Sequence, residues 1–77
     1  MEISDFLSKF KAQFVEGDSI QLSIEDDFRQ IESYDSLTGM AILVMIKDEF
    51  GLDITDDEYK LLGTVKAIYE YLITKKG

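Results

Sequence analysis

The fold is decided by residues 35–51, whose sequence is DSLTGMAILVMIKDEFG. Asp35 is a good helix N-cap, because its carboxylate can accept hydrogen bonds from free backbone N–H groups. Seven consecutive apolar residues lie inside the stretch, and Gly51 is a natural C-terminal residue. The pattern therefore predicts a helix over residues 36–50. Ser36 would stand in its first turn, where partial positive charge and unpaired N–H groups stabilise an attached phosphate.

The apolar run is too long to lie on one face of the predicted helix. Helical spacing directs one set of side chains toward the core, namely Ile42, Leu43, Ile46 and Phe50. Leu37, Met40 and Val44 then form a second strip next to Ser36. An exposed apolar strip rimmed by acids is a candidate protein-docking surface. The alternative, that all of these residues belong to the core, stays open.

The flanking sequence predicts three more helices. Residues 2–15 are amphipathic, with apolar side chains on one face at Ile3, Phe6, Leu7, Phe10 and Phe14. The run Thr55-Asp56-Asp57-Glu58 has the spacing of a capping box and predicts a short helix that ends near residues 62–63. Thr64 can cap a last helix, with Val65, Ile68, Tyr69 and Leu72 on its apolar face, and we expect it to end near Thr74.

A long connection, residues 16–35, precedes the second predicted helix. Ile20, Leu22 and Ile24 alternate with polar residues, which is a local strand pattern, but the sequence offers no second strand to pair with it. We therefore expect an extended loop that lays three apolar side chains across helix ends. The fold class is then all-α, with residues 1–77 forming a single domain. It is a small four-helix bundle of three longer helices and one short third helix.

Composition and charge exclude several kinds of site and partner. The chain has 77 residues, a net charge of −8, no cysteine and no histidine, so neither a disulfide nor the common zinc ligands are available. Thirteen of the 16 acids but only two of the eight bases lie between Glu16 and Glu58. The negative electrostatic field of these acids repels nucleic acid and anionic membranes and attracts basic protein surfaces. No apolar stretch is long enough to span a membrane and no secretory signal is visible, so we expect a cytoplasmic monomer.

Catalytic and metal-binding patterns are weak. The sequence shows no nucleophile with a partner base, because a histidine that could activate Ser36 is missing, so we expect no enzyme activity and no catalytic residues. Asp53, Thr55 and Asp57 have the spacing of an EF-hand start, but Glu58 and Thr64 occupy the positions that require glycine and glutamate. We expect no metal centre, although a weak divalent-ion site at Asp53, Asp56 and Asp57 stays open.

The spacing around Ser36 resembles that of the acyl carrier protein family. Phe28 lies eight residues before Ser36, and Phe50-Gly51 begins fourteen residues after it. The landmarks of the third and fourth helices then follow without a gap: Ile54, Asp56-Asp57-Glu58, Thr64-Val65 and Tyr71-Leu72. Asp-Ser-Leu alone is a common string, and the resemblance depends on the string together with this spacing.

The resemblance implies that Ser36 carries a 4′-phosphopantetheine arm derived from coenzyme A, with Asp35 and Leu37 completing the attachment motif. The protein would then carry acyl or similar intermediates as thioesters for fatty acid, polyketide or related secondary-metabolite biosynthesis. Its partners would be a phosphopantetheinyl transferase and acyl-loading or ketosynthase-type enzymes. The alternative function is an acidic helical protein-interaction adaptor without a prosthetic group.

The resemblance also implies two surfaces. An apolar cleft for the acyl chain would be lined by Phe28, Ile46, Ile54 and Leu62. Partners would dock on Leu37, Met40 and Val44, guided by acids at Glu32, Asp35, Asp48 and Glu49.

Several positions depart from the family pattern. Carriers of fatty acid synthesis commonly have Gly-Ala before Asp-Ser-Leu and acids after it, whereas this chain has Ser33-Tyr34 before it and Thr38, Gly39 and Ala41 after it. Gly39 lowers helix propensity by up to about 1 kcal/mol relative to alanine. We therefore expect weaker electrostatic guidance of partners, a larger part for Tyr34, and a specialised, free-standing carrier with a dedicated loading enzyme. The sequence does not identify the cargo.

Overall fold

A computed structural model of the chain describes residues 1–76, except for the side chain of Asp18. The elements in this range are α1 (Ile3–Lys11), η1 (Gly17–Ser19), η2 (Phe28–Gln30), α2 (Ser36–Phe50), α3 (Asp56–Leu61) and α4 (Val65–Lys76), where η denotes a 3₁₀ turn. The predicted all-α fold of three longer helices and one short third helix is thereby confirmed. Within residues 1–76, β pairing is limited to an isolated bridge between Asp27 and Thr64.

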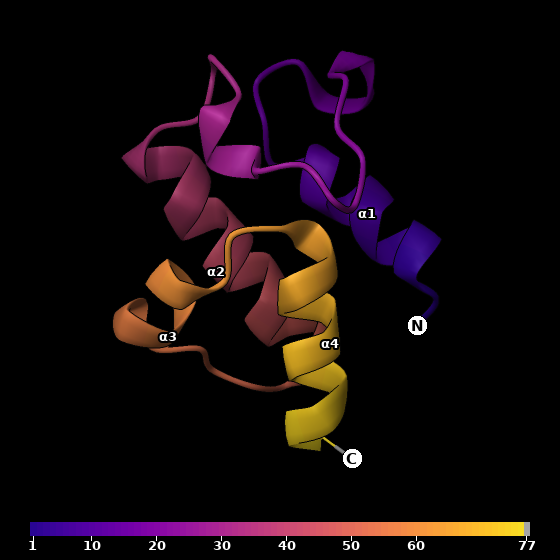
Figure 1. The fold of residues 1–77 in the computed structure, drawn as a ribbon, viewed down its shortest axis with the longest axis vertical. Helices are drawn as coiled ribbons and strands as arrows, with labels where there is room; N and C mark the ends of the chain where they lie inside the picture. Colours follow the sequence, from indigo (N-terminus) through magenta and orange to yellow (C-terminus); the bar gives the residue numbers. More distant parts are fainter. Residues whose placement is uncertain (77) are drawn as a thin grey trace.

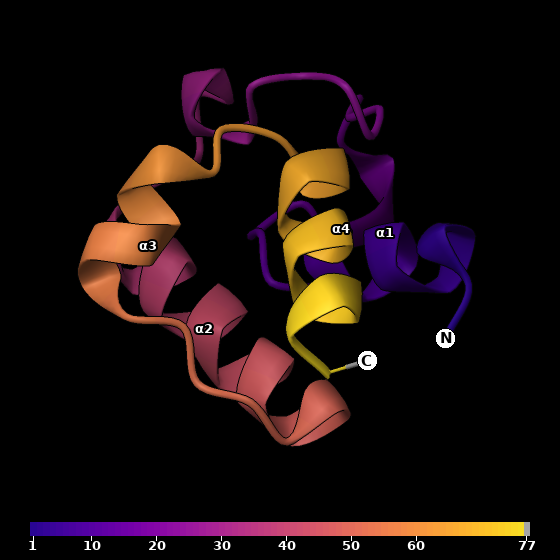
Figure 2. The same cartoon turned by 60° about the horizontal axis from the view of Figure 1, so that its bottom comes forward.

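The helices surround one core (Figure 1). α1 runs upward in Figure 1, whereas α2 and α4 run downward. The short α3 lies beside α2 in both Figure 1 and Figure 2, and the long connection between α1 and α2 crosses the upper end of the bundle. This arrangement places the beginning of α2 near both the connection and α3.

Both ends of α2 follow from its sequence. The Asp35 carboxylate accepts hydrogen bonds from the backbone N–H of Thr38 at 2.9 Å and from the Thr38 hydroxyl at 3.0 Å. These bonds lower the pKa of Asp35. At the other end, Gly51 has a φ of 68°, a left-handed conformation that glycine adopts without steric cost, and its N–H donates to the carbonyl of Lys47 at 2.8 Å. The predicted bounds of this helix are confirmed.

Aromatic side chains connect the helices in the core. Phe6 of α1 meets Phe50 of α2 edge to face, with ring centroids 5.6 Å apart, and Phe10 meets Phe28 in the same way at 4.9 Å. The inward set predicted for α2 is buried at Ile42, Ile46 and Phe50, while Leu43 is half-buried. Met45 is also buried, although its position was not assigned to the core.

Two helix ends differ from the sequence prediction. α1 ends at Lys11 instead of residue 15, because Gln13 and Phe14 donate to carbonyls three residues back and the chain tightens into a turn. Phe14 is nevertheless buried, so the turn satisfies the apolar pattern that suggested a longer helix. α4 continues to Lys76, beyond the expected end at Thr74, and the Lys76 ammonium donates to the carbonyl of Phe50 at 3.0 Å.

The long connection packs as an extended loop, as predicted. Ile20 and Leu22 are buried and Ile24 is half-buried. The Ile24 carbonyl accepts from the backbone N–H of Lys66 at 2.9 Å. Farther along, the Arg29 guanidinium donates to the carbonyls of Leu62 at 3.0 Å and Tyr59 at 2.5 Å. Because these carbonyls lie at the end of α3, a cation there also opposes the helix dipole.

The capping box of α3 is complete. The Thr55 hydroxyl accepts from the N–H of Glu58 at 3.1 Å, and the Glu58 carboxylate accepts from the N–H of Thr55 at 2.8 Å. Tyr71 of α4 donates its hydroxyl hydrogen to the same carboxylate. The Tyr71 bond, followed by the bond from Thr55, lowers the pKa of Glu58 from 4.5 to about 2.

We expect Glu58 to contribute to the loss of stability in acid. Its pKa is lower in the folded state than in the unfolded chain, so its contribution is fully present above pH 4.5 and is lost as the pH falls through about 2. Glu58→Gln should therefore be less stable than the parent at pH 7 and should lose less further stability between pH 4.5 and 2. Urea midpoints across this range measure the effect. Glu70→Gln is the exposed control, and parallel pH curves for parent and Glu58→Gln would contradict the prediction.

Two negative findings apply to residues 1–76. None of the helices in this range has the length and apolar composition that crossing a bilayer requires. Among the side chains that the structure describes, which exclude that of Asp18, no three with carboxylate, imidazole or thiol groups are gathered as a metal site would need, and this includes the acids around Asp53.

Candidate functional site

Ser36 is the first residue of α2 and is exposed to solvent. Its position follows from Asp35, which caps the helix and leaves the next residue in the first turn. The nearest other serine, Ser33, has its hydroxyl oxygen buried. Of these two hydroxyls, the one at Ser36 is therefore the one that a modifying enzyme can reach.

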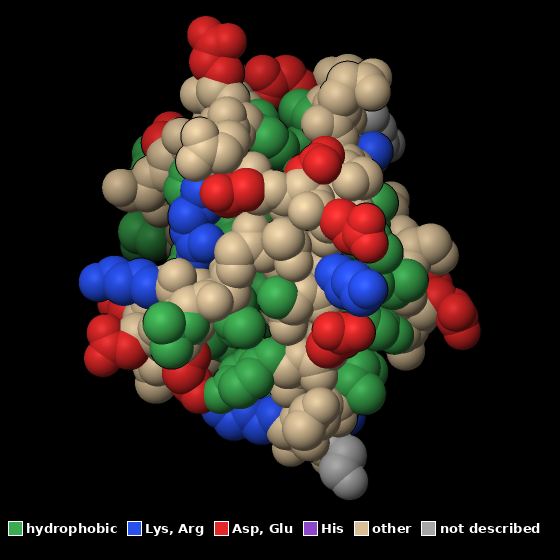
Figure 3. Space-filling model, viewed as in Figure 1, with side chains coloured by type: hydrophobic (Ala, Val, Ile, Leu, Met, Phe, Trp, Pro, Cys, Tyr) green, Lys and Arg blue, Asp and Glu red, His purple; other side chains and the backbone are tan. Residues whose placement is uncertain are grey.

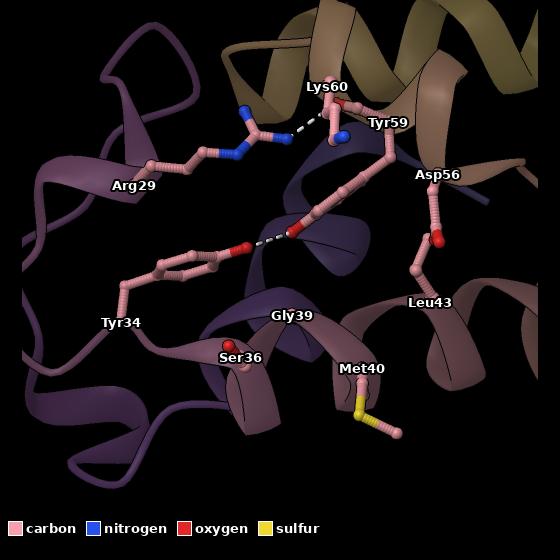
Figure 4. Close-up of a pocket in the computed structure, with 9 residues that line it drawn as sticks. All are labelled: Arg29, Tyr34, Ser36, Gly39, Met40, Leu43, Asp56, Tyr59 and Lys60. Carbon is pink, nitrogen blue, oxygen red and sulfur yellow. Dashed lines mark hydrogen bonds between the residues drawn. The ribbon is translucent and has the colours of Figure 1, made fainter.

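A cavity of about 380 Å³ opens beside Ser36, between α2, α3 and the end of the long connection (Figure 4). This volume falls in the range of small-molecule sites, which runs from about 300 to 1,000 Å³. Its lining consists of Arg29, Tyr34, Ser36, Gly39, Met40, Leu43, Asp56, Tyr59 and Lys60.

Two tyrosines meet across this cavity. The hydroxyl oxygens of Tyr34 and Tyr59 are 2.9 Å apart, and the two side chains reach toward each other above Gly39 (Figure 4). A Cβ atom at Gly39 would lie only 2.7 Å from the Tyr34 hydroxyl oxygen. The glycine that weakens α2 by its low propensity is therefore required by the close approach of Tyr34.

Arg29 stabilises one wall of the cavity. Its guanidinium carbon lies 4.6 Å from the ring centroid of Phe28 and 4.4 Å from that of Tyr59, which is within the range of cation–π attraction. Burial raises the pKa of Tyr59 well above its usual value, and the bond to Tyr34 raises it further. Tyr59 therefore stays neutral and keeps its hydroxyl hydrogen at physiological pH.

The apolar strip predicted on α2 is exposed. Leu37, Met40 and Val44 are 74%, 63% and 60% exposed, so the alternative that they belong to the core is wrong. Among the proposed guiding acids, Glu32 and Asp48 are exposed, as is Glu49, which pairs with Lys9 of α1 at 3.6 Å. Figure 3 shows acidic, basic and apolar side chains together on the side of the molecule where α3 lies.

The residues proposed for an acyl cleft lie in the core. Phe28 and Ile46 have no exposed surface, Ile54 is 8% exposed and Leu62 is half-buried. The described cavity beside Ser36 is lined by other residues. An acyl chain among these four side chains stays a prediction, and it would require the core to open.

Sequence reasoning did not assign most of the cavity wall. Arg29, Leu43, Asp56, Tyr59 and Lys60 come from three separate segments, and their lining of one cavity depends on tertiary packing. A glycine inside a helix is a known signal of close packing, and Gly39 was such a signal here.

The sequence of the chain is similar to those of known proteins. Residues 12–72 match the family described as a phosphopantetheine attachment site. An acyl carrier protein of Thermobifida fusca (strain YX) is 31% identical over 71 residues, which cover 92% of this chain and 90% of that protein. The chain belongs to the acyl carrier protein family. An acyl carrier protein of Thermosynechococcus vestitus is 28% identical over 78 residues, covering 97% of this chain and 96% of the relative.

Membership in the acyl carrier protein family confirms the resemblance seen in the sequence. The attachment domain of this family carries a covalently bound 4′-phosphopantetheine group. Its members are carriers and not catalysts. The exposed hydroxyl of Ser36, the first turn of α2 and the adjacent cavity fit such a group, because an anion is stabilised there and the arm has space to fold back.

Proposed function

We propose that Ser36 is the attachment serine and that the protein carries acyl groups as thioesters at the end of the arm. The observation that carries this proposal is the exposed Ser36 hydroxyl at the capped start of α2, next to a cavity that the arm can reach. The arm supplies a thiol, which the chain itself lacks because it has no cysteine. Ser36 would be modified by a separate transferase.

The pathway belongs to the same proposal. The cargo serves fatty acid, polyketide or related secondary-metabolite biosynthesis, and a dedicated loading enzyme supplies it. Support comes from the departures at Tyr34 and Gly39, which bring a pair of tyrosine hydroxyls to the cavity next to Ser36. Ketosynthase-type enzymes and the loading enzyme would each bind the carrier transiently.

Intact mass spectrometry tests the attachment. The purified chain is incubated with coenzyme A, Mg²⁺ and a broad-specificity phosphopantetheinyl transferase, and its mass is compared with that of an untreated sample. We expect the addition of one arm, located at Ser36 by peptide fragmentation. An unchanged mass would favour the alternative of an acidic helical adaptor without a prosthetic group.

The exposed strip of α2 is proposed as the docking surface. Charge attraction between exposed groups is screened beyond about 8 Å at physiological ionic strength, so the acids should affect mainly the association rate. Apolar contacts to Leu37, Met40 and Val44 should determine how long a complex lasts. We therefore expect Met40→Ser to slow arm transfer at every salt concentration.

Transfer kinetics in a salt series separate the two effects. The charge variant should combine Glu32→Gln and Asp48→Asn and leave Glu49 unchanged, because Glu49 also pairs with Lys9 within the chain. This variant should lose salt dependence and approach the parent rate at high salt. The proposed roles, in which the acids affect the association rate and the apolar strip determines the lifetime of the complex, are wrong under one outcome. In that outcome, Met40→Ser has the parent rate while the charge variant is inactive at all salt concentrations.

A further inference from the structure

Thr38 lies in the first turn of α2 and is buried, although its side chain is polar. It is 5% exposed, whereas nearly all other buried side chains of the described residues are apolar. Its hydroxyl donates to Oδ1 of Asp35 at 3.0 Å. A buried hydroxyl without a partner costs stability, so the Asp35 carboxylate satisfies a group that water does not reach.

Two hydrogen bonds from Thr38 converge on one oxygen of the Asp35 carboxylate. The backbone N–H reaches Oδ1 at 2.9 Å, and the hydroxyl reaches the same oxygen at 3.0 Å. A helix N-cap needs only the first of these bonds. The second restricts rotation of the carboxylate, because Thr38 is itself held by burial and by its branched Cβ. Asp35 therefore has a defined orientation although it is exposed to solvent.

The other carboxylate oxygen of Asp35, Oδ2, is left for a group outside the chain. Among the residues that the structure describes, the hydrogen bonds to this carboxylate reach Oδ1. The bond from the Thr38 N–H, followed by that from its hydroxyl, lowers the pKa of Asp35, so the carboxylate is ionised at physiological pH. Asp35 directly precedes Ser36 at the start of α2 (Figure 4). An oriented anionic acceptor thus lies one residue from the proposed attachment hydroxyl.

Arm transfer brings anionic phosphates to the same place. The Ser36 oxygen would bond to the pantetheine-side phosphorus of coenzyme A, the bond from that phosphorus to 3′,5′-ADP would break, and the hydroxyl proton would pass to a base of the transferase. An enzyme that holds these phosphates needs cationic groups around them. Arginine and lysine also donate strong, charge-assisted hydrogen bonds to a carboxylate. The ionised Asp35 is therefore suited to such a side chain of the transferase.

We propose that Thr38 is a positioning residue for arm transfer: its buried hydroxyl orients the Asp35 carboxylate, so that Oδ2 accepts a hydrogen bond from a cationic side chain of the transferase. The inference rests on the proposed attachment of the arm to Ser36. Because Thr38 is buried, it acts through Asp35 and touches neither the coenzyme nor the reacting atoms.

The test separates the hydroxyl of Thr38 from its methyl group. Thr38→Val keeps the branched shape and the N–H bond to Asp35 but lacks the hydroxyl, Thr38→Ser keeps the hydroxyl, and Thr38→Ala lacks both groups. Thr64→Val is the matched control, because the Thr64 hydroxyl also caps a helix, accepting from the N–H of Ala67 at 3.0 Å, but at the start of α4. For each protein, kcat and the KM for the carrier are measured with coenzyme A, Mg²⁺ and the broad-specificity transferase.

We expect Thr38→Val to raise the KM for the carrier about fivefold, the size of one net hydrogen bond, and to leave kcat nearly unchanged, because the contact does not involve the reacting atoms. Thr38→Ser should have a KM within about twofold of the parent, since the hydroxyl bond is retained. Thr64→Val should have the parent KM. Urea midpoints should fall for both Thr38→Val and Thr38→Ser, so stability alone does not explain the difference in KM.

A double-mutant cycle tests whether Thr38 acts through Asp35. Asp35→Asn keeps an oxygen for the helix cap but replaces Oδ2 by an amide group that donates, so it should raise the KM at least as much as Thr38→Val does. Adding Thr38→Val to Asp35→Asn should then have no further effect, because no acceptor is left to orient. An equal loss from Thr38→Val in both backgrounds would show a purely structural role and overturn the proposal.

The outcomes separate this inference from the function on which it rests. If the parent gains no arm at Ser36, both are overturned. If the parent gains the arm there but Thr38→Val keeps the parent KM, only the inference is overturned. A KM of Thr38→Ser equal to that of Thr38→Val also overturns it, because the hydroxyl then has no effect. Circular dichroism verifies the folding of each variant, and the comparison of Thr38→Ser with Thr38→Ala replaces Thr38→Val if that variant does not fold.

Discussion

Ser36→Ala is expected to abolish addition of the phosphopantetheine arm while leaving the fold intact. The variant lacks the hydroxyl oxygen at which the proposed phosphodiester is made. Its cost in stability should be small, below about 0.5 kcal/mol, because Ser36 is exposed and the cap of α2 is provided by Asp35. Intact mass after treatment with coenzyme A and the transferase measures the first effect, and the urea midpoint measures the second.

Ser33→Ala is the matched control for this experiment. Ser33 lies three residues before Ser36, but its hydroxyl oxygen is buried, so a transferase cannot reach it without local opening. The control should gain one arm at the parent rate. Labelling of Ser36→Ala by a pantetheine probe would place the attachment site on another residue. Loss of labelling in both variants would point to a damaged docking surface instead of a missing acceptor.

The bounds of α2 could be predicted because both of its ends are determined by local chemistry. Asp35 can accept from the N–H groups that the helix leaves free, and Gly51 can adopt the left-handed conformation that ends it. The exposed strip also followed from one helix, since its spacing separates Leu37, Met40 and Val44 from the buried face. A single segment contains all of this information.

The cavity wall could not be predicted in the same way. Tyr34 and Tyr59 are separated by 25 positions in the sequence. The periodicity of apolar residues does not predict that their hydroxyls form a hydrogen bond. In the sequence, Gly39 was interpreted only as lowering helix propensity, and the packed structure shows that the Tyr34 hydroxyl approaches α2 at this glycine. The predicted end of α1 was wrong for a related reason, because Phe14 can be buried by a turn as well as by a helix.

Phe28→Ala is expected to have the largest effect on stability. Phe28 has no exposed surface and contacts rings from three parts of the chain, those of Phe10, Tyr34 and Tyr59. Removing a buried phenylalanine ring typically costs about 3–5 kcal/mol through lost transfer energy and the cavity that remains. A chain of this length has a total stability of about 4–12 kcal/mol, so the variant should lose between about a quarter and all of its stability.

Urea unfolding followed by far-ultraviolet circular dichroism measures this loss, with Leu61→Ala as the control. Leu61 is 86% exposed, so its truncation should change stability by no more than about 0.5 kcal/mol. Phe28→Leu should lie between the two, because it keeps most of the apolar volume. The Phe28 ring also supports the Arg29 guanidinium at 4.6 Å, so loss of the ring should loosen the cavity wall next to Ser36 before the helices separate. Equal midpoints for Phe28→Ala and Leu61→Ala would show that Phe28 is not the centre of this packing.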